Sequence, residues 1–144
     1  MLYLDTSFVA PLVIAENSSD AVEAWVLKVD PGELATSLWT QVELSSLVSR
    51  KVRMGELTGA KGNEVRREFD RILGEFFEML TPTAGDFATA SRYLEVPRTG
   101  LRAGDALHLA VAANRGATRI LTLDQGFLGA GRLLKLPVAR GIKA

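Results

Sequence analysis

Near its amino terminus the chain contains Leu2-Tyr3-Leu4-Asp5-Thr6-Ser7, a short apolar run followed by a carboxylate and two hydroxyls. This pattern is typical of a buried strand that ends at Asp5. A second run of this kind, Arg119-Ile120-Leu121-Thr122-Leu123, also ends at a carboxylate, Asp124. Because the segments between them are mostly helical in pattern, the two runs predict strands of one parallel sheet.

The segments between these runs alternate between helical and strand-like patterns. We expect five helices. The first has Asp20 as its N-cap and ends before Pro31-Gly32, and the second ends at Gly55. The third covers residues 65–76, the fourth begins at Thr83 in a capping box, and the fifth runs from about Gly104 to Gly116. Short strands are expected at residues 34–36 and 78–80. The alternation predicts an α/β fold with a parallel sheet covered on both faces, in a single domain over residues 1–144.

Length and composition exclude several classes of site. The chain has 144 residues, of which 47% are hydrophobic, enough for one globular core without a disulfide or structural metal. It has no cysteine and only one histidine, His108, which excludes disulfides, thiol nucleophiles and His-rich metal sites. The apolar stretch 8–15 contains Pro11 and is too short to span a membrane, so a cytoplasmic protein without membrane contact is expected.

The net charge is zero, with 17 basic and 17 acidic residues. Taken alone, this balance argues against binding to nucleic acid. The charges are unevenly distributed, however, because residues 1–49 hold seven acids and one base, and residues 50–144 hold ten acids and sixteen bases. The balance therefore does not exclude a local basic surface.

Four acidic residues occupy positions where a globular protein rarely places a charge. Asp5 and Asp124 follow predicted strands, and ligands bind at the carboxyl ends of strands in open parallel sheets. Glu43 lies about 40° from Leu47 on a helical wheel, and Asp105 lies about 40° from Leu109, so both border apolar faces.

Each of these acids also has a purely structural interpretation. Asp5 could cap a helix, Asp105 could favour a helix dipole, Glu43 could reach solvent from a half-buried face, and Asp124 could belong to a turn. Four such placements together favour a shared site. Converging carboxylates repel one another unless a cation neutralises them, and oxygen ligands select Mg²⁺ or Mn²⁺. Such a site typically supports hydrolysis of a phosphate ester.

Four segments of the chain resemble the four motifs of the PIN-domain family, in order and over nearly the whole length. The chain also has the size of the compact members, the VapC-type toxins of toxin–antitoxin pairs. The pairs Arg102-x-x-Asp105 and Asp124-x-x-Phe127 make the set specific. The segments are Leu2-Tyr3-Leu4-Asp5-Thr6-Ser7, Thr40-Gln41-Val42-Glu43-Leu44, residues 101–110 (LRAGDALHLA) and residues 121–127 (LTLDQGF).

The resemblance implies a three-layer α/β/α sandwich around a mostly parallel sheet, and an endoribonuclease that depends on Mg²⁺ or Mn²⁺. It implies that Asp5 and Asp105 hold the metal and that Glu43 and Asp124 complete the acidic site, directly or through water. Thr6, Ser7 and Thr122 match positions where the family often has a supporting hydroxyl. The reaction expected is attack of a metal-activated water on an RNA phosphodiester, leaving 5′-phosphate and 3′-hydroxyl ends.

Basic residues near these motifs are candidates for contacts with RNA phosphates. They are Arg50, Lys51, Arg53, Arg98 and Arg102. The alternative for each is a solvated helix end or loop. His108, one turn after Asp105, is expected to have a packing role rather than a catalytic one.

The resemblance also implies a cognate antitoxin and a homodimer as partners. Four aromatic residues are candidate anchors for either interface, or core residues: Trp25, Trp39, Phe76 and Phe77. Two alternative functions remain within the family, a nuclease of RNA maturation and a non-catalytic binding module. A phosphatase with an aspartyl nucleophile at Asp5 is disfavoured, because that class needs a second Asp where this chain has Ser7.

Overall fold

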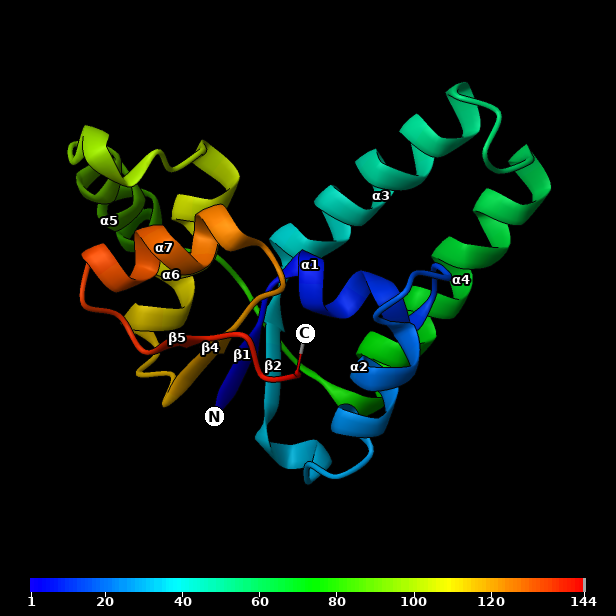
Figure 1. Ribbon diagram of the computed structural model, residues 1–144, viewed down its shortest axis with the longest axis horizontal. Helices are drawn as coiled ribbons and strands as arrows, with labels where there is room; N and C mark the ends of the chain where they lie inside the picture. Colours follow the sequence, from blue (N-terminus) through cyan, green and yellow to red (C-terminus); the bar gives the residue numbers. More distant parts are fainter. Residues whose placement is uncertain (144) are drawn as a thin grey trace.

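The computed structural model describes residues 1–143 and has a five-stranded sheet between two layers of helices (Figure 1). Its strands pair in parallel in the order β3-β2-β1-β4-β5. The strands are β1 (Leu2–Leu4), β2 (Leu34–Ser37), β3 (Glu78–Leu80), β4 (Arg119–Leu121) and β5 (Val138–Ala139). The predicted α/β sandwich around a parallel sheet is confirmed.

Helices α1 to α4 cover one face of the sheet, and α5 to α7 cover the other (Figure 1). The α-helices are α1 (Thr6–Val9), α2 (Ser19–Val26), α3 (Leu38–Arg53), α4 (Gly59–Phe76), α5 (Ala84–Leu94), α6 (Ala103–Asn114) and α7 (Gln125–Leu133). Short 3₁₀ helices are η1 (Ala10–Leu12), η2 (Pro31–Glu33) and η3 (Pro97–Thr99).

The two layers follow from the alternation of side chains along each strand, because successive residues of a strand point to opposite faces. Leu4 and Leu121 belong to the core beneath α1 to α4. Tyr3 and Ile120 belong to the core beneath α5 to α7. The apolar runs recognised in the sequence are therefore apolar because both faces of the sheet are buried.

Strand β1 lies in the middle of the sheet, between β2 and β4. From β1 the chain moves through β2 to β3 on one side, and β4 and β5 then form on the other side. The direction of progression thus reverses between β1 and β4. In open parallel sheets a crevice forms at the carboxyl ends of such a strand pair, and Asp5 and Asp124 follow these two strands.

The N-cap predicted for α2 was wrong, and two elements were missed. The N-cap of α2 is Ser18 rather than Asp20, whose carboxylate instead lies in the first turn of the helix. The helix ends at Val26, before Pro31. Helix α7 and strand β5 were not predicted, because α7 contains three glycines that hide its periodicity and β5 has only two residues.

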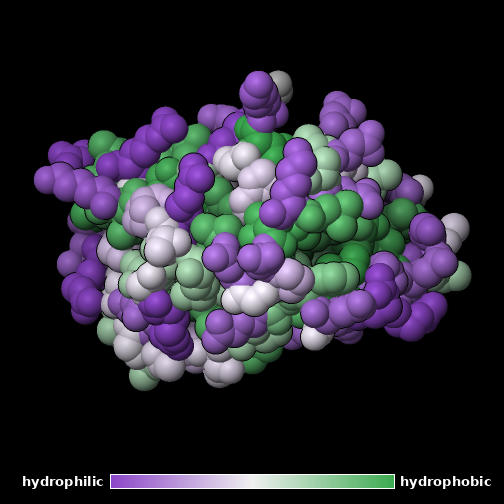
Figure 2. Space-filling view, turned by 90° about the horizontal axis from the view of Figure 1, so that it is seen from below, coloured by the Kyte–Doolittle hydropathy of each residue, from purple (hydrophilic) through white to green (hydrophobic). Residues whose placement is uncertain are grey.

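The surface seen from below mixes polar and apolar side chains, and the apolar ones gather towards the right of the view (Figure 2). A groove of about 400 Å³ between α2 and α4 has an apolar lining that includes Leu27 and Phe76. Among the other candidate anchors, Trp25 packs edge-on against Phe8 and Phe77 is buried, so both serve the core. None of the helices within the described residues is long and apolar enough to cross a membrane.

Candidate active site

A pocket of about 270 Å³ lies at the crevice between β1 and β4. The four acids singled out in the sequence all line it. Its lining residues are Asp5, Thr6, Ser7, Glu43, Arg102, Gly104, Asp105, His108 and Asp124. The tertiary structure therefore brings together four carboxylates that are up to 119 positions apart in the sequence, from the ends of two strands and from two helices.

Asp5 is buried, with 3% of its surface exposed, and both of its carboxylate oxygens accept hydrogen bonds from the protein. Its Oδ1 accepts hydrogen bonds from Ser7 Oγ at 2.7 Å and from the backbone N–H of Phe8 at 3.0 Å. Its Oδ2 accepts from Thr122 Oγ1 at 2.7 Å. Burial raises the pKa of Asp5 to about 6, although the hydrogen bonds from Thr122, Ser7 and Phe8 oppose the rise.

Asp5 is therefore both a helix cap and a member of the pocket. As N-cap of α1 it accepts a hydrogen bond from an otherwise free N–H of the first turn, so the alternative prediction that Asp5 caps a helix is confirmed. The cap orients its carboxylate, because a buried N–H and two hydroxyls fix both oxygens. Capping and participation in a site are compatible at this position.

The loop after β4 is tied to β1 by the two hydroxyls that contact Asp5. Ser7 Oγ and Thr122 Oγ1 lie 3.1 Å apart, and the N–H of Leu123 donates to Ser7 Oγ at 2.9 Å. The N–H of Asp124 donates to Thr122 Oγ1 at 3.1 Å. Ser7 and Thr122 thus support Asp5 and also position the segment that carries Asp124.

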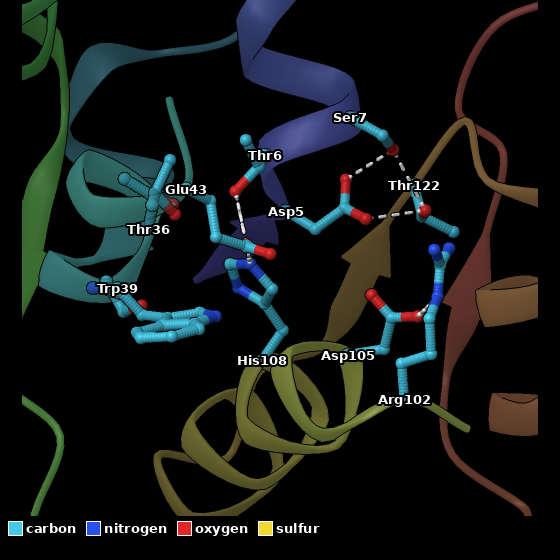
Figure 3. Close-up of polar contacts among 12 residues, drawn as sticks. Asp5, Thr6, Ser7, Thr36, Trp39, Glu43, Arg102, Asp105, His108 and Thr122 are labelled. Atoms are coloured by element: carbon cyan, nitrogen blue, oxygen red, sulfur yellow. Dashed lines mark hydrogen bonds and ion pairs between the residues drawn. The ribbon is translucent and has the colours of Figure 1, made fainter. Parts of the chain in front are cut away.

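Glu43 projects from α3 and meets two donors from other elements (Figure 3). Thr6 Oγ1 donates to Glu43 Oε1 at 2.7 Å, and His108 Nε2 contacts the same oxygen. Burial alone would raise the pKa of Glu43, but the hydrogen bonds from His108 and Thr6 and the charge of Arg102 outweigh it and hold the pKa below its ordinary value. Thr6 therefore supports Glu43 rather than Asp5.

Asp105 and Asp124 face the guanidinium of Arg102. The distances are 3.7 Å from Arg102 Nε to Asp105 Oδ2 and 3.6 Å from Arg102 Nη2 to Asp124 Oδ2. Burial raises the pKa of Asp105; Arg102 opposes this rise, and the charges of Asp124 and Glu43 add to it. The side chain of Arg102 is 80% exposed, so its guanidinium is accessible to a ligand that enters the pocket.

The chemistry of the pocket suits a hard divalent cation, since four carboxylates line it and burial, together with the charges of Asp124 and Glu43, raises the pKa of Asp105. Within residues 1–143, however, no three Asp, Glu or His side chains form a group that would hold a metal ion as they stand. Each carboxylate is engaged with a protein donor: a hydroxyl at Asp5 and Glu43, and Arg102 at Asp105 and Asp124. Binding a cation would exchange some of these contacts for metal–oxygen bonds.

Four of the five basic candidates lie outside the pocket lining. Arg50, Lys51 and Arg53 occupy the last turns of α3, beginning about two helical turns beyond Glu43. Lys51 forms an ion pair with Glu56 at 3.0 Å. Arg98 is on η3, and only Arg102 lines the pocket. Contacts of all five with RNA remain predictions.

His108 has polar contacts in addition to the packing role predicted for it. This residue is buried, with 1% of its surface exposed, and it joins the pocket through Glu43 and Thr6. One signal was present in the sequence: His108 follows Asp105 by three residues on one helix, which places both on neighbouring positions of the same face. The contact of His108 with Tyr3 had no such signal.

Comparison with known proteins agrees with this geometry. The PIN domain family matches residues 2–133. Ribonuclease VapC35 from Mycobacterium tuberculosis is 33% identical over 142 residues, which cover 96% of this chain and 95% of that protein.

Two solved structures share the fold at low sequence identity. VapC20 from Mycobacterium tuberculosis, described as a sarcin-ricin loop cleaving toxin, has a TM-score of 0.75 at 21% identity and covers 91% of this chain and 95% of its own. VapBC2 from Rickettsia felis, bound to a DNA fragment from its promoter, has a TM-score of 0.68 at 19% identity, covering 96% and 98%. With a family match over nearly its whole length and four acids gathered at the switch point of its sheet, this chain belongs to the PIN-domain family.

Proposed function

We propose that this protein is an endoribonuclease that depends on Mg²⁺ or Mn²⁺ and acts as the toxin of a toxin–antitoxin pair. The observation that carries the proposal is the convergence of Asp5, Glu43, Asp105 and Asp124 in one pocket. The similarity to a ribonuclease over 96% of the chain supports the substrate class. A binding module without activity would have no need to gather four carboxylates at a cost in repulsion.

In this proposal Asp5 and Asp105 hold the cation. When bound, the cation would lower the pKa of a water molecule and neutralise charge that develops on the phosphate. Glu43, held by Thr6 and His108, would orient the attacking water. Arg102 would contact a phosphate oxygen, because its exposed guanidinium lies above Asp105 and Asp124. Cleavage would leave 5′-phosphate and 3′-hydroxyl ends.

The experiment is cleavage of a defined RNA by the purified protein, freed of any partner, with the ends of the products mapped. We expect cleavage with Mg²⁺ or Mn²⁺, loss of cleavage in EDTA and recovery when the metal is restored. An Asp5→Asn, Asp105→Asn double variant should be inactive, and a matched variant of the exposed acid Glu78 on β3, Glu78→Gln, should be active. Equal cleavage by the double variant and the wild type would refute the assignment.

We also propose a cognate antitoxin as partner and a homodimer as the assembled form. The fold shared with VapBC2 supports the first proposal. The expected observation is a small neighbouring reading frame whose product, when co-expressed, abolishes the growth arrest caused by this protein. Sedimentation of the separated protein tests the dimer. Growth without arrest on expression of the protein alone would favour a role in RNA maturation instead.

A further inference from the structure

Three side chains form a hydrogen-bonded chain that runs from the interior of the sheet to the pocket. The hydroxyl of Tyr3, on β1, lies 2.7 Å from Nδ1 of His108, on α6. Nε2 of the same imidazole contacts Oε1 of Glu43, on α3 (Figure 3). Tyr3 and His108 are both buried, with 0% and 1% of their surfaces exposed. These hydrogen bonds thus connect β1, the middle strand, to α3 and α6, the two helices that carry pocket acids.

The placement of hydrogen atoms follows from the chemistry of the two ends. An ionised carboxylate only accepts hydrogen bonds, so the contact at Glu43 requires a proton on His108 Nε2. A tyrosine phenol is protonated at neutral pH, because its ordinary pKa is about 10, so the buried hydroxyl of Tyr3 can donate a hydrogen bond. His108 Nδ1 is the acceptor when the ring is in the neutral Nε2–H tautomer.

Packing alone does not explain a histidine at this position. The neighbouring residues of α6, Leu107, Leu109 and Ala110, are apolar and buried, and they need no polar partner. The ring of His108 does pack in this layer, with centroids 5.9 Å from Tyr3 and 6.4 Å from Phe127. An apolar side chain could fill the same space without the desolvation that a buried imidazole must offset with hydrogen bonds.

We infer that Tyr3 fixes the Nε2–H tautomer of His108, and that His108 in turn orients the carboxylate of Glu43 in the active site. His108 is therefore a positioning residue, and Tyr3 acts through it. This inference rests on the proposed nuclease function for its consequence on rate, but its statement about the tautomer stands independently of that function.

The orientation concerns one oxygen of Glu43. Thr6 and His108 both contact Oε1, from two different elements. Two donors on one oxygen fix the direction of the carboxylate, and Oε2 can then accept a hydrogen bond from a water molecule in the pocket. Without His108, Thr6 would be the remaining donor of this pair. The Glu43 carboxylate could then rotate about its Cγ–Cδ bond.

The tautomer is measured directly by ¹⁵N NMR of the imidazole at neutral pH, without RNA or metal. His108 is the only histidine in the chain, so its two ring nitrogens need no assignment among others. We expect a protonated Nε2 and an unprotonated Nδ1 in the wild type. Tyr3→Phe should shift the Nδ1 resonance and mix the tautomers, whereas Tyr93→Phe, which removes the only other tyrosine hydroxyl, should leave the spectrum unchanged. An imidazolium or an Nδ1–H tautomer in the wild type would overturn the inference.

The effect on positioning is measured with two variants of His108 in the cleavage assay. His108→Leu keeps an apolar volume but no donor, and kcat should fall roughly 10- to 100-fold with little change in KM, as is typical for loss of an outer partner of a metal site. His108→Gln keeps an N–H that reaches Glu43 and should recover most of the rate. Equal losses for Leu and Gln in folded variants would contradict a positioning role. Wild-type protein that cleaves no RNA would refute the proposed function, while the NMR result would still decide the tautomer.

Discussion

Thr122 donates a hydrogen bond from Oγ1 to Oδ2 of Asp5 over 2.7 Å, and it is fully buried. This contact joins the end of β4 to the end of β1, two strands whose residues are 117 positions apart. The same Thr122 oxygen accepts the N–H of Asp124. One hydroxyl thus positions two of the four acids.

Thr122→Val should destabilise the protein at neutral pH by about 1 to 3 kcal/mol, because it leaves the ionised Asp5 oxygen and the N–H of Asp124 without this partner. Thr122→Ser retains the hydroxyl and should cost less. Urea unfolding of both variants and the wild type at pH 7 measures the difference. A Val variant as stable as the Ser variant would show that this bond does not stabilise the fold.

Asp5 should make the metal-free protein less stable as the pH rises. Its folded-state pKa of about 6 exceeds that of an unfolded chain, so the folded state binds the proton more tightly. The contribution of protonated Asp5 to the free energy of unfolding is therefore fully present below about pH 4. It is lost as the pH rises through 6, and the loss amounts to roughly 2 to 3 kcal/mol.

Asp5→Asn removes this dependence. In EDTA the variant should be more stable than the wild type at pH 7, and the difference should shrink towards pH 4. Chemical unfolding at four pH values, with the variant subtracted from the wild type, separates the contribution of Asp5 from those of other titrating groups. A difference that is constant with pH would contradict the raised pKa of Asp5.

Gly104→Ala should lower activity more than stability. A Cβ at Gly104 would lie 3.0 Å from Glu43 Oε2 and 3.2 Å from Trp39 Nε1, so the flexible carboxylate would have to move. The control is Gly85→Ala, at the same position of α5, where the nearest atom lies at 3.6 Å. We expect a reduced kcat for Gly104→Ala and an unchanged one for Gly85→Ala, with similar melting temperatures. Equal activity of the two variants would show that activity does not depend on the position of the Glu43 carboxylate.

Two glycines of α7 should respond to alanine with opposite signs. A Cβ at Gly131 would lie 2.3 Å from Val138 Cγ1 on β5, and the overpacking should cost about 1 to 3 kcal/mol. Gly129 is exposed, and a Cβ there would meet no atom within 4 Å, so Gly129→Ala should stabilise the helix by about 0.5 to 1 kcal/mol. Thermal unfolding of both variants tests the close contact of α7 with β5. Equal shifts of the melting temperature in the two variants would disprove this contact.

Arg102→Gln should weaken RNA binding through loss of one phosphate contact. The slope of log affinity against log salt should fall by about one unit, and affinity should fall similarly for different RNA sequences. Arg119→Gln, at the opposite end of β4 from Asp124, is the control. Binding is measured with the inactive Asp5→Asn, Asp105→Asn protein at several salt concentrations. An unchanged slope for Arg102→Gln would remove this residue from the RNA-binding surface.

The sequence by itself determined the class of fold and marked four acids as candidates for a shared site. Short runs of mostly apolar residues marked β1 to β4, since most of their side chains pack beneath a layer of helices. Helical spacing marked α3 to α6, and it placed Glu43 and Asp105 at the borders of apolar faces. These are local properties, set by the periodicity of a strand or a helix, and they can be read without knowing what packs against them.

Only the tertiary structure decided which acids meet in one pocket and which are enclosed by scaffold residues. The sequence Ala-Gly-Asp begins both α5, with Asp86, and α6, with Asp105. Asp86 is fully buried and is bound by Asn114 and Arg115, whereas Asp105 opens into the pocket. The local sequence is identical, and the outcome depends on what the fold brings opposite each carboxylate. The same reason hid the contact between Tyr3 and His108, whose partners lie 105 positions apart.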